Sequence, residues 1–181
     1  MTTEEKSLTR GMVQVYTGNG KGKTTASLGL AFRASGHGFR VYVMQFMKGS
    51  TVYGELAAAR RLAPELTIEQ VGRDTFVSRS HPAEEDCRMA REGFARARKM
   101  VASGEFDLIV LDELNCAVDF GLVPLDGVKE MIQEKAPLTE LVLTGRGAHP
   151  DIMELADLVT ETREVKHYYN SGQHARTGIE H

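Results

Sequence analysis

The sequence predicts an α/β fold in which a mostly parallel sheet carries helices on both faces. Apolar, β-prone segments alternate with helical patterns along the chain, as in sheets built from βαβ units. Several strand segments are apolar at nearly every position, which is typical of strands covered on both faces. The chain has 181 residues and no repeat, linker or low-complexity segment, so we expect one domain spanning residues 1–181.

The first strand–helix junction carries a glycine-rich turn. Residues 12–17 read as a strand and lead into Gly18-Asn19-Gly20-Lys21-Gly22-Lys23-Thr24-Thr25 and then a helix. Glycines let backbone N–H groups point toward phosphates, and the helix N-terminus adds positive dipole character there. Lys23 can reach the phosphates, and the Thr24 hydroxyl can bind Mg²⁺. The usual spacing would put a glycine at Thr17, but strand, turn and helix together predict a nucleotide site of the P-loop NTPase type.

The next elements follow in order. The first helix is expected over 24–35, followed by a strand at 39–46, a short helix at 55–62 and a strand at 66–71. The loop 72–81 leads to Pro82, which suits the first position of a long helix. That helix has one apolar stripe, acidic residues in its first turn and basic residues toward its end.

The second half continues the alternation. We expect a strand at 106–113, a helix at 124–134, a strand at 140–144, a helix at 150–156 and a last strand at 158–162. Residues 1–10 are polar and are expected to form a mobile arm. The tail 164–181 reads either as a frayed terminus or, because of Tyr168, Tyr169 and His167, as a segment packed near the site.

The strand at 106–113 ends in two acids. In nucleotide-binding α/β folds such a strand delivers a carboxylate to the Mg²⁺ beside the phosphates. Asp112 and Glu113 are both candidates, and the sequence leaves open which of them holds the ion. Arg146 follows the strand at 140–144 and therefore lies at the same carboxyl edge, where ligands collect in open α/β sheets.

Composition excludes several classes of protein. A net charge of −3 provides no basic footprint for nucleic acid. Cys87 and Cys116 are far apart and indicate neither a zinc site nor a disulfide framework; they read as core residues or as neighbours of a pocket. No histidines have metal-ligand spacing. The first ten residues lack a signal-peptide core and no apolar run could span a membrane, so we expect a cytoplasmic protein.

The order of several motifs resembles the P-loop ATP:corrinoid adenosyltransferases of cobalamin biosynthesis. The motifs are the turn at 17–25, Gln45-Phe46-Met47-Lys48-Gly49, Leu111-Asp112-Glu113-Leu114, Thr144-Gly145-Arg146-Gly147, Val165-Lys166-His167 and Gly178-Ile179-Glu180. The resemblance extends from about residue 11 to residue 180. Each motif alone is common, and their combination is specific.

The resemblance implies transfer of the 5′-deoxyadenosyl group of ATP to Co(I) of a reduced corrinoid, with release of triphosphate. It implies ATP and Mg²⁺ at the glycine-rich turn, with catalytic roles for Lys23, Thr24 and Glu113. The ATP-binding set is then Gly18, Asn19, Gly20, Lys21, Gly22, Lys23, Thr24, Thr25 and Arg146, and the metal set is Thr24, Glu113 and Asp112. It also implies a reduced flavoprotein as electron donor and a homodimer.

The resemblance further implies an apolar wall that helps to reduce Co(II) by displacing its lower ligand. The matching loop is 72–80, and Phe76 is the candidate wall residue, with a simple core position as the alternative. Members of the family carry a Phe and a Trp in this loop, whereas this chain contains no tryptophan. Lys48, Glu55 and His167 are further candidates for contact with the corrinoid.

Two other functions fit a P-loop protein. A kinase or plain ATPase would release ADP, and a nucleotide-dependent regulatory module would bind ATP without turning it over. A kinase needs a base beside its acceptor hydroxyl, and the sequence shows no such pair. The tail motif and the Thr-Gly-Arg-Gly turn favour the adenosyltransferase, because neither alternative requires them.

Overall fold

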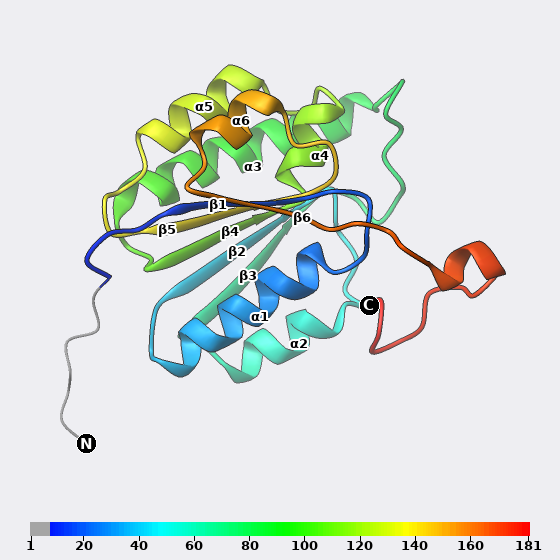
Figure 1. Ribbon diagram of the computed structural model, residues 1–181, viewed down its shortest axis with the longest axis horizontal. Coiled ribbons are helices and arrows are strands. Elements are labelled where there is room, and N and C mark those ends of the chain that lie inside the picture. Colours follow the sequence, from blue (N-terminus) through cyan, green and yellow to red (C-terminus); the bar gives the residue numbers. More distant parts are fainter. Residues whose placement is uncertain (1–7) are drawn as a thin grey trace.

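The computed structural model describes residues 8–181, and its centre is one six-stranded sheet (Figure 1). The strands are β1 (Val13–Thr17), β2 (Val41–Phe46), β3 (Leu66–Val71), β4 (Leu108–Asp112), β5 (Glu140–Thr144) and β6 (Leu158–Glu161). Their order in the sheet is β3-β2-β4-β5-β1-β6, and every neighbouring pair is parallel. The expected parallel α/β fold is therefore confirmed.

Helices cover both faces of this sheet. They are α1 (Lys23–Gly36), α2 (Gly54–Arg61), α3 (Glu84–Ser103), α4 (Leu114–Asp119), α5 (Leu125–Gln133) and α6 (Pro150–Leu155), followed by the short helix η1 (Tyr168–Ser171). Figure 1 shows α1 and α2 on one face and α3 to α6 on the other. Because each parallel strand is followed by a crossover, the carboxyl ends of the strands meet at one edge.

The core consists of two apolar layers, one on each side of the sheet. Successive residues of β4 alternate between them: Ile109 and Leu111 join the layer under α3 to α6, while Leu108 and Val110 join the layer under α1 and α2. All residues of β2 and β4 are buried. Successive side chains of a strand point to opposite faces of the sheet, and here both faces are buried. This explains why these strands are apolar at nearly every position.

Some expected boundaries were wrong. The long helix begins at Glu84, with extended Ala83 as its N-cap, so Pro82 precedes the cap and does not occupy the first helical position. Strand β2 begins at Val41 rather than at residue 39. The helix α4 was not expected, because six residues are too few to show a helical period.

The expected arm at 1–10 falls largely outside the described residues; of its last part, Arg10 pairs with Asp157 at 3.4 Å. Residues 164–181 leave β6, form η1 and return toward the carboxyl edge of the sheet (Figure 1). Within residues 8–181, none of the helices combines the length and apolar character that crossing a membrane requires.

Candidate active site

The glycine-rich turn between β1 and α1 is shaped by two glycines with positive φ. Gly18 has φ 93° and Gly22 has φ 119°, values that L-residues with side chains rarely adopt. Gly22 is the N-cap of α1. The turn is fastened to the chain after β6, because Gly20 N–H donates to the carbonyl of Thr162 at 2.9 Å. A rigid, open loop at a helix N-terminus is the arrangement that binds phosphates.

Lys23 is held inside this turn. Its Nζ donates to the carbonyls of Gly18 at 2.6 Å and Gly20 at 2.8 Å, and to Thr162 Oγ1 at 3.4 Å. Burial lowers the pKa of Lys23, and attraction to Glu113 opposes that shift. The ammonium is therefore held at the centre of the loop, where an entering anion would take the place of one of these three acceptors.

We expect Gly18→Ala to damage this loop. A Cβ at Gly18 would lie 2.3 Å from the Thr162 carbonyl oxygen, and the strained φ adds a cost of about 1–3 kcal/mol. Urea unfolding should show that loss, and titration with ATP should show weaker binding.

The matched control is Gly29→Ala on α1, where an added Cβ meets nothing within 4 Å. Alanine at an exposed helical position should stabilise the protein by about 0.5–1 kcal/mol without changing ATP affinity. Equal ATP affinity in the Gly18 and Gly29 variants would contradict the role assigned to the loop.

At the carboxyl edge of the sheet, Asp112 accepts hydrogen bonds from several different elements. Its Oδ1 accepts from Thr24 Oγ1 at 2.9 Å and Thr144 Oγ1 at 2.6 Å, and its Oδ2 accepts from Lys48 Nζ at 2.9 Å. Gln45 Nε2 also approaches Oδ2, at 3.4 Å. The end of β4 is thereby joined to α1, β5 and the loop after β2.

Lys48 provides the positive charge that pairs with the Asp112 carboxylate. Burial alone would lower the pKa of Lys48, but attraction and hydrogen bonding to Asp112 outweigh it and raise the pKa. The side chains of Lys48 and Asp112 are only 16% and 1% exposed, so this is a desolvated pair whose partners depend on each other.

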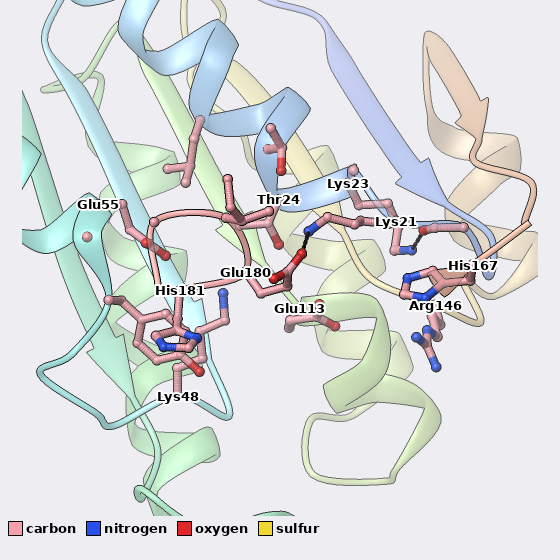
Figure 2. Close-up of a pocket in the computed structure, with 18 of the residues that line it drawn as sticks. Lys21, Lys23, Thr24, Lys48, Glu55, Glu113, Arg146, His167, Glu180 and His181 are labelled. Carbon is pink, nitrogen blue, oxygen red and sulfur yellow. Dashed lines mark hydrogen bonds and ion pairs between the residues drawn. The ribbon is translucent and has the colours of Figure 1, made fainter. Parts of the chain in front are cut away.

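Glu113 leaves the strand in a different direction. It has φ 62° and is the N-cap of α4, and its N–H donates to Thr144 Oγ1 at 3.0 Å. Its side chain faces the cavity beside the phosphate loop (Figure 2). The two acids therefore differ in place: Asp112 is buried among hydrogen-bond donors, and Glu113 lines open space.

The turn that carries Arg146 rests on α4. Cys116 Sγ accepts from the N–H of Arg146 at 3.2 Å and lies 3.6 Å from its carbonyl oxygen. Burial, and then the neighbouring Glu113 carboxylate, raise the pKa of the Cys116 thiol from 9.0 to about 12. Cys116 is thus a neighbour of the pocket, one of the two positions expected for it.

The raised pKa predicts that Cys116 stays a neutral, poorly reactive thiol. At pH 8 it should carry roughly a thousandfold less thiolate than a free cysteine. Iodoacetamide should therefore modify it at least about a hundredfold more slowly in folded protein than in urea, as followed by mass spectrometry. Above pH 9 the unfolded state releases this proton first, so this group should lower the free energy of unfolding as pH rises. Rapid labelling of the folded protein would contradict the assignment.

The chain's tail returns across the site. The Tyr168 hydroxyl donates to Glu180, Arg176 lies over the Tyr168 ring at 4.8 Å, and Glu180 Oε1 is 3.6 Å from Lys21 Nζ. Hydrogen bonds from Tyr168, then from Arg176, lower the pKa of Glu180 to about 2. Glu180 is therefore ionised at neutral pH, and the stability that its pairing contributes is lost as pH falls from about 4.5 to about 2. Figure 2 shows its carboxylate facing Lys21 in the middle of the pocket.

Two cavities adjoin at this edge. The first, of about 550 Å³, follows the phosphate loop and the tail, and the second, of about 870 Å³, lies along the loop 72–81. Both are lined by the same five residues, namely Asn19, Lys48, Tyr53, Glu113 and Arg146. Their common wall is where two bound molecules would meet.

Most of the expected ATP residues line the first cavity: Asn19, Gly20, Lys21, Gly22, Lys23, Thr24, Thr25 and Arg146. Gly18 contributes its carbonyl to Lys23. Of the residues expected beside a corrinoid, Phe76 and Lys48 line the second cavity, whereas Glu55 and His167 line the first. Phe76 is 96% exposed, so the alternative that it is a core residue was wrong.

Several polar groups at the site were not predicted to be site residues, although two of them, Gln45 and Thr144, stand in the motifs quoted above. Gln45, Thr144 and Thr162 bind Asp112 or Lys23 directly. Two of them could have been found, because Gln45 and Thr144 lie at the carboxyl ends of β2 and β5, where sites form in parallel sheets. No local pattern indicated that Thr162 would close the phosphate loop.

The fold and the site define a class: a P-loop-type α/β nucleotide-binding protein with a second cavity beside the nucleotide cavity. Within that class, the chain belongs to the family described as ATP:corrinoid adenosyltransferase BtuR/CobO/CobP, whose family model matches residues 9–181.

Individual relatives agree with that membership. The corrinoid adenosyltransferase of Escherichia coli (strain K12) is 41% identical over 172 residues, which cover 95% of this chain and 86% of that protein. That of Pseudomonas aeruginosa is 39% identical over 171 residues, covering 94% and 84%. Corrinoid adenosyltransferase CobA of Salmonella typhimurium is 39% identical over 172 residues, covering 95% and 86%.

Proposed function

We propose that this protein transfers the 5′-deoxyadenosyl group of ATP to Co(I) of a corrinoid and releases triphosphate. The observation that carries the proposal is the pair of adjoining cavities with five lining residues in common. One cavity contains the phosphate loop, and the other is larger and is bordered by an exposed aromatic residue, Phe76. Membership of the adenosyltransferase family supports assigning ATP to the first and the corrinoid to the second.

The reaction is a displacement at the ribose C5′. The Co(I) electron pair forms the Co–C bond, the C5′–O bond breaks, and its electrons leave with triphosphate, so cobalt becomes Co(III). Because Co(I) carries no proton, no side chain has to act as a base. The protein must hold two molecules in line and stabilise charge on the leaving group.

The cations of the first cavity suit that task. Lys23 lies at the centre of the loop, Lys21 faces the cavity beside it, and Arg146 approaches from the turn after β5 (Figure 2). Loop N–H groups and the N-terminus of α1 add fixed dipoles. The loop dipoles are in place before the nucleotide arrives, whereas Lys21 would exchange its Glu180 partner for the phosphates.

Mg²⁺ fits the oxygen donors at this edge. The Thr24 hydroxyl and Asp112 Oδ1 lie 2.9 Å apart, and Glu113 faces the same cavity. Within the described residues, no group of three or more His, Cys, Asp or Glu side chains could hold a metal alone. Phosphate oxygens and water would therefore complete the magnesium shell, as is usual for this ion. When bound, Mg²⁺ would neutralise charge on the triphosphate.

An anaerobic reaction with ATP, Mg²⁺ and chemically reduced Co(I) corrinoid tests the proposal. Adenosylated corrinoid and triphosphate should form in equal amounts, as measured by absorbance and ion chromatography. ADP and phosphate with unchanged corrinoid would instead indicate a kinase or ATPase, and bound but unreacted ATP would indicate a regulatory module.

Phe76 provides a second test, because it is the wall residue expected to make Co(II) easier to reduce. Phe76→Ala should lower the rate starting from Co(II) and a reduced flavin at least about tenfold, with a much smaller effect on the rate starting from Co(I). Equal losses in the two assays would count against the role. Asp74, in the same loop and cavity, offers a control in Asp74→Asn.

The proposal includes two further properties that the family resemblance implies. A reduced flavoprotein would supply the electron for Co(II), and the chain would act as a homodimer. Light scattering of the purified protein, and reduction assays with and without a reduced flavoprotein, test these two points separately.

A further inference from the structure

The loop 72–81, between β3 and α3, is attached to the body of the protein at three points. Arg73 binds Asp86 at the start of α3 with two hydrogen bonds, of 2.8 and 2.6 Å. Val77 is 4% exposed and packs in the core. At its far end, Arg79 Nη2 donates to Asp119 Oδ1 at 2.7 Å. Phe76 lies between these attachments.

Asp119 is placed where its charge needs a partner. It is the last residue of α4, and the carbonyl groups at a helix C-terminus disfavour a neighbouring negative charge. Arg79 supplies the compensating cation. The pair therefore joins the end of α4 to the loop 72–81 through two opposite charges.

Asp119 also borders the turn that carries Arg146. A Cβ built on Gly147 would lie 3.2 Å from Asp119 Cγ, and Gly147 itself has φ 65°. The helix α4 begins after Glu113, which lines both cavities. A single short helix thus touches the nucleotide cavity at one end and the Phe76 loop at the other.

We infer that the Arg79–Asp119 pair positions Phe76 against the second cavity, so that both are positioning residues for the Co(II) reduction step. The inference rests on the proposed function. The Arg79 and Asp119 side chains are 68% and 28% exposed, and pairs of this kind shift an equilibrium by up to about fivefold. The pair therefore tunes the loop, while Arg73 and Val77 keep it folded.

The first test compares two assays of Asp119→Asn at saturating ATP and corrinoid. The rate from Co(II) and a reduced flavin should fall about three- to fivefold, as expected for losing one such pair. The rate from chemically reduced Co(I) should change less than about twofold. A merely structural defect would lower both rates together.

Two companion variants make the comparison specific. Glu92→Gln breaks an exposed pair with Arg88 on α3, of 2.8 Å, and should leave both rates unchanged. The double reversal Arg79→Glu with Asp119→Arg restores an opposite pair and should recover most of the loss seen in either single reversal. Failure of this recovery would overturn the pairing as the cause.

The second test does not depend on catalysis. Because the chain contains no tryptophan, Phe76→Trp creates a single fluorescent reporter in the loop. Adding Asp119→Asn to that variant should lower its fluorescence anisotropy, because the loop is less firmly held, whereas adding Glu92→Gln should not.

The two tests separate the inference from the function on which it rests. If the wild-type protein makes no adenosylated corrinoid from Co(I), the proposed function fails, and the fluorescence result still reports on the pair. If Asp119→Asn changes neither the fluorescence nor the ratio of the two rates, the inference is overturned while the function stands.

Discussion

Lys23→Met is expected to lower kcat/KM for adenosyl transfer about a hundred- to a thousandfold. Groups aimed at charge that develops in a transition state contribute that much when a single one is removed. Here the Lys23 ammonium is already held at the centre of the loop by the carbonyls of Gly18 and Gly20, beside the place proposed for the triphosphate. Anaerobic assays with Co(I) corrinoid at several ATP concentrations measure the effect.

The same substitution should cost less in stability than in rate. The Gly18 carbonyl loses its Lys23 donor and the Gly20 carbonyl keeps only Thr162, which corresponds to about 1–3 kcal/mol. Urea unfolding separates this loss from catalysis. Lys99→Met, on the exposed side of α3, removes the same charge far from the cavities and should change neither quantity. A Lys23→Met enzyme within about fivefold of wild type would contradict the assignment.

Asp112→Asn is expected to destabilise the protein by about 3–5 kcal/mol. The change leaves the Lys48 ammonium desolvated without its anion, and removing one partner of a buried pair has effects of this size. It should also weaken magnesium-dependent ATP binding, because Thr24 loses its carboxylate partner and the proposed metal site keeps only Glu113. Urea unfolding and calorimetric titration measure the two effects.

A double-mutant cycle identifies the source of that instability. Adding Lys48→Met to Asp112→Asn removes the orphaned charge, so the double variant should be more stable than Asp112→Asn alone. Additive effects of the two substitutions would mean that the pair is not coupled. Glu113→Gln serves as the control on stability, because Glu113 lines open space and lacks the buried partners of Asp112.

Local sequence patterns were sufficient to predict the strands of a parallel sheet, the longer helices and the phosphate loop. A glycine-rich turn between a strand and a helix fixes its own geometry, so Lys23 and Thr24 could be assigned without knowledge of the rest of the fold. The same applies to the carboxyl edge, because parallel strands bring their ends together wherever they lie in the sequence.

Features that depend on distant contacts could not be predicted in this way. The different placement of Asp112 and Glu113 follows from the positive φ of Glu113, which takes the chain out of the strand and into α4. That helix is too short to be recognised by its period. The return of Glu180 to Lys21 depends on Tyr168 and Arg176, and no local signal gives the path of such a tail.

The common wall of the two cavities has a thermodynamic consequence. Glu113 and Arg146 line both cavities. If ATP binding moves either side chain, it therefore also changes the wall of the cavity proposed for the corrinoid. Whatever factor ATP introduces into corrinoid affinity must then equal the factor that the corrinoid introduces into ATP affinity. One coupling free energy, measured from either side, describes how the enzyme assembles its ternary complex.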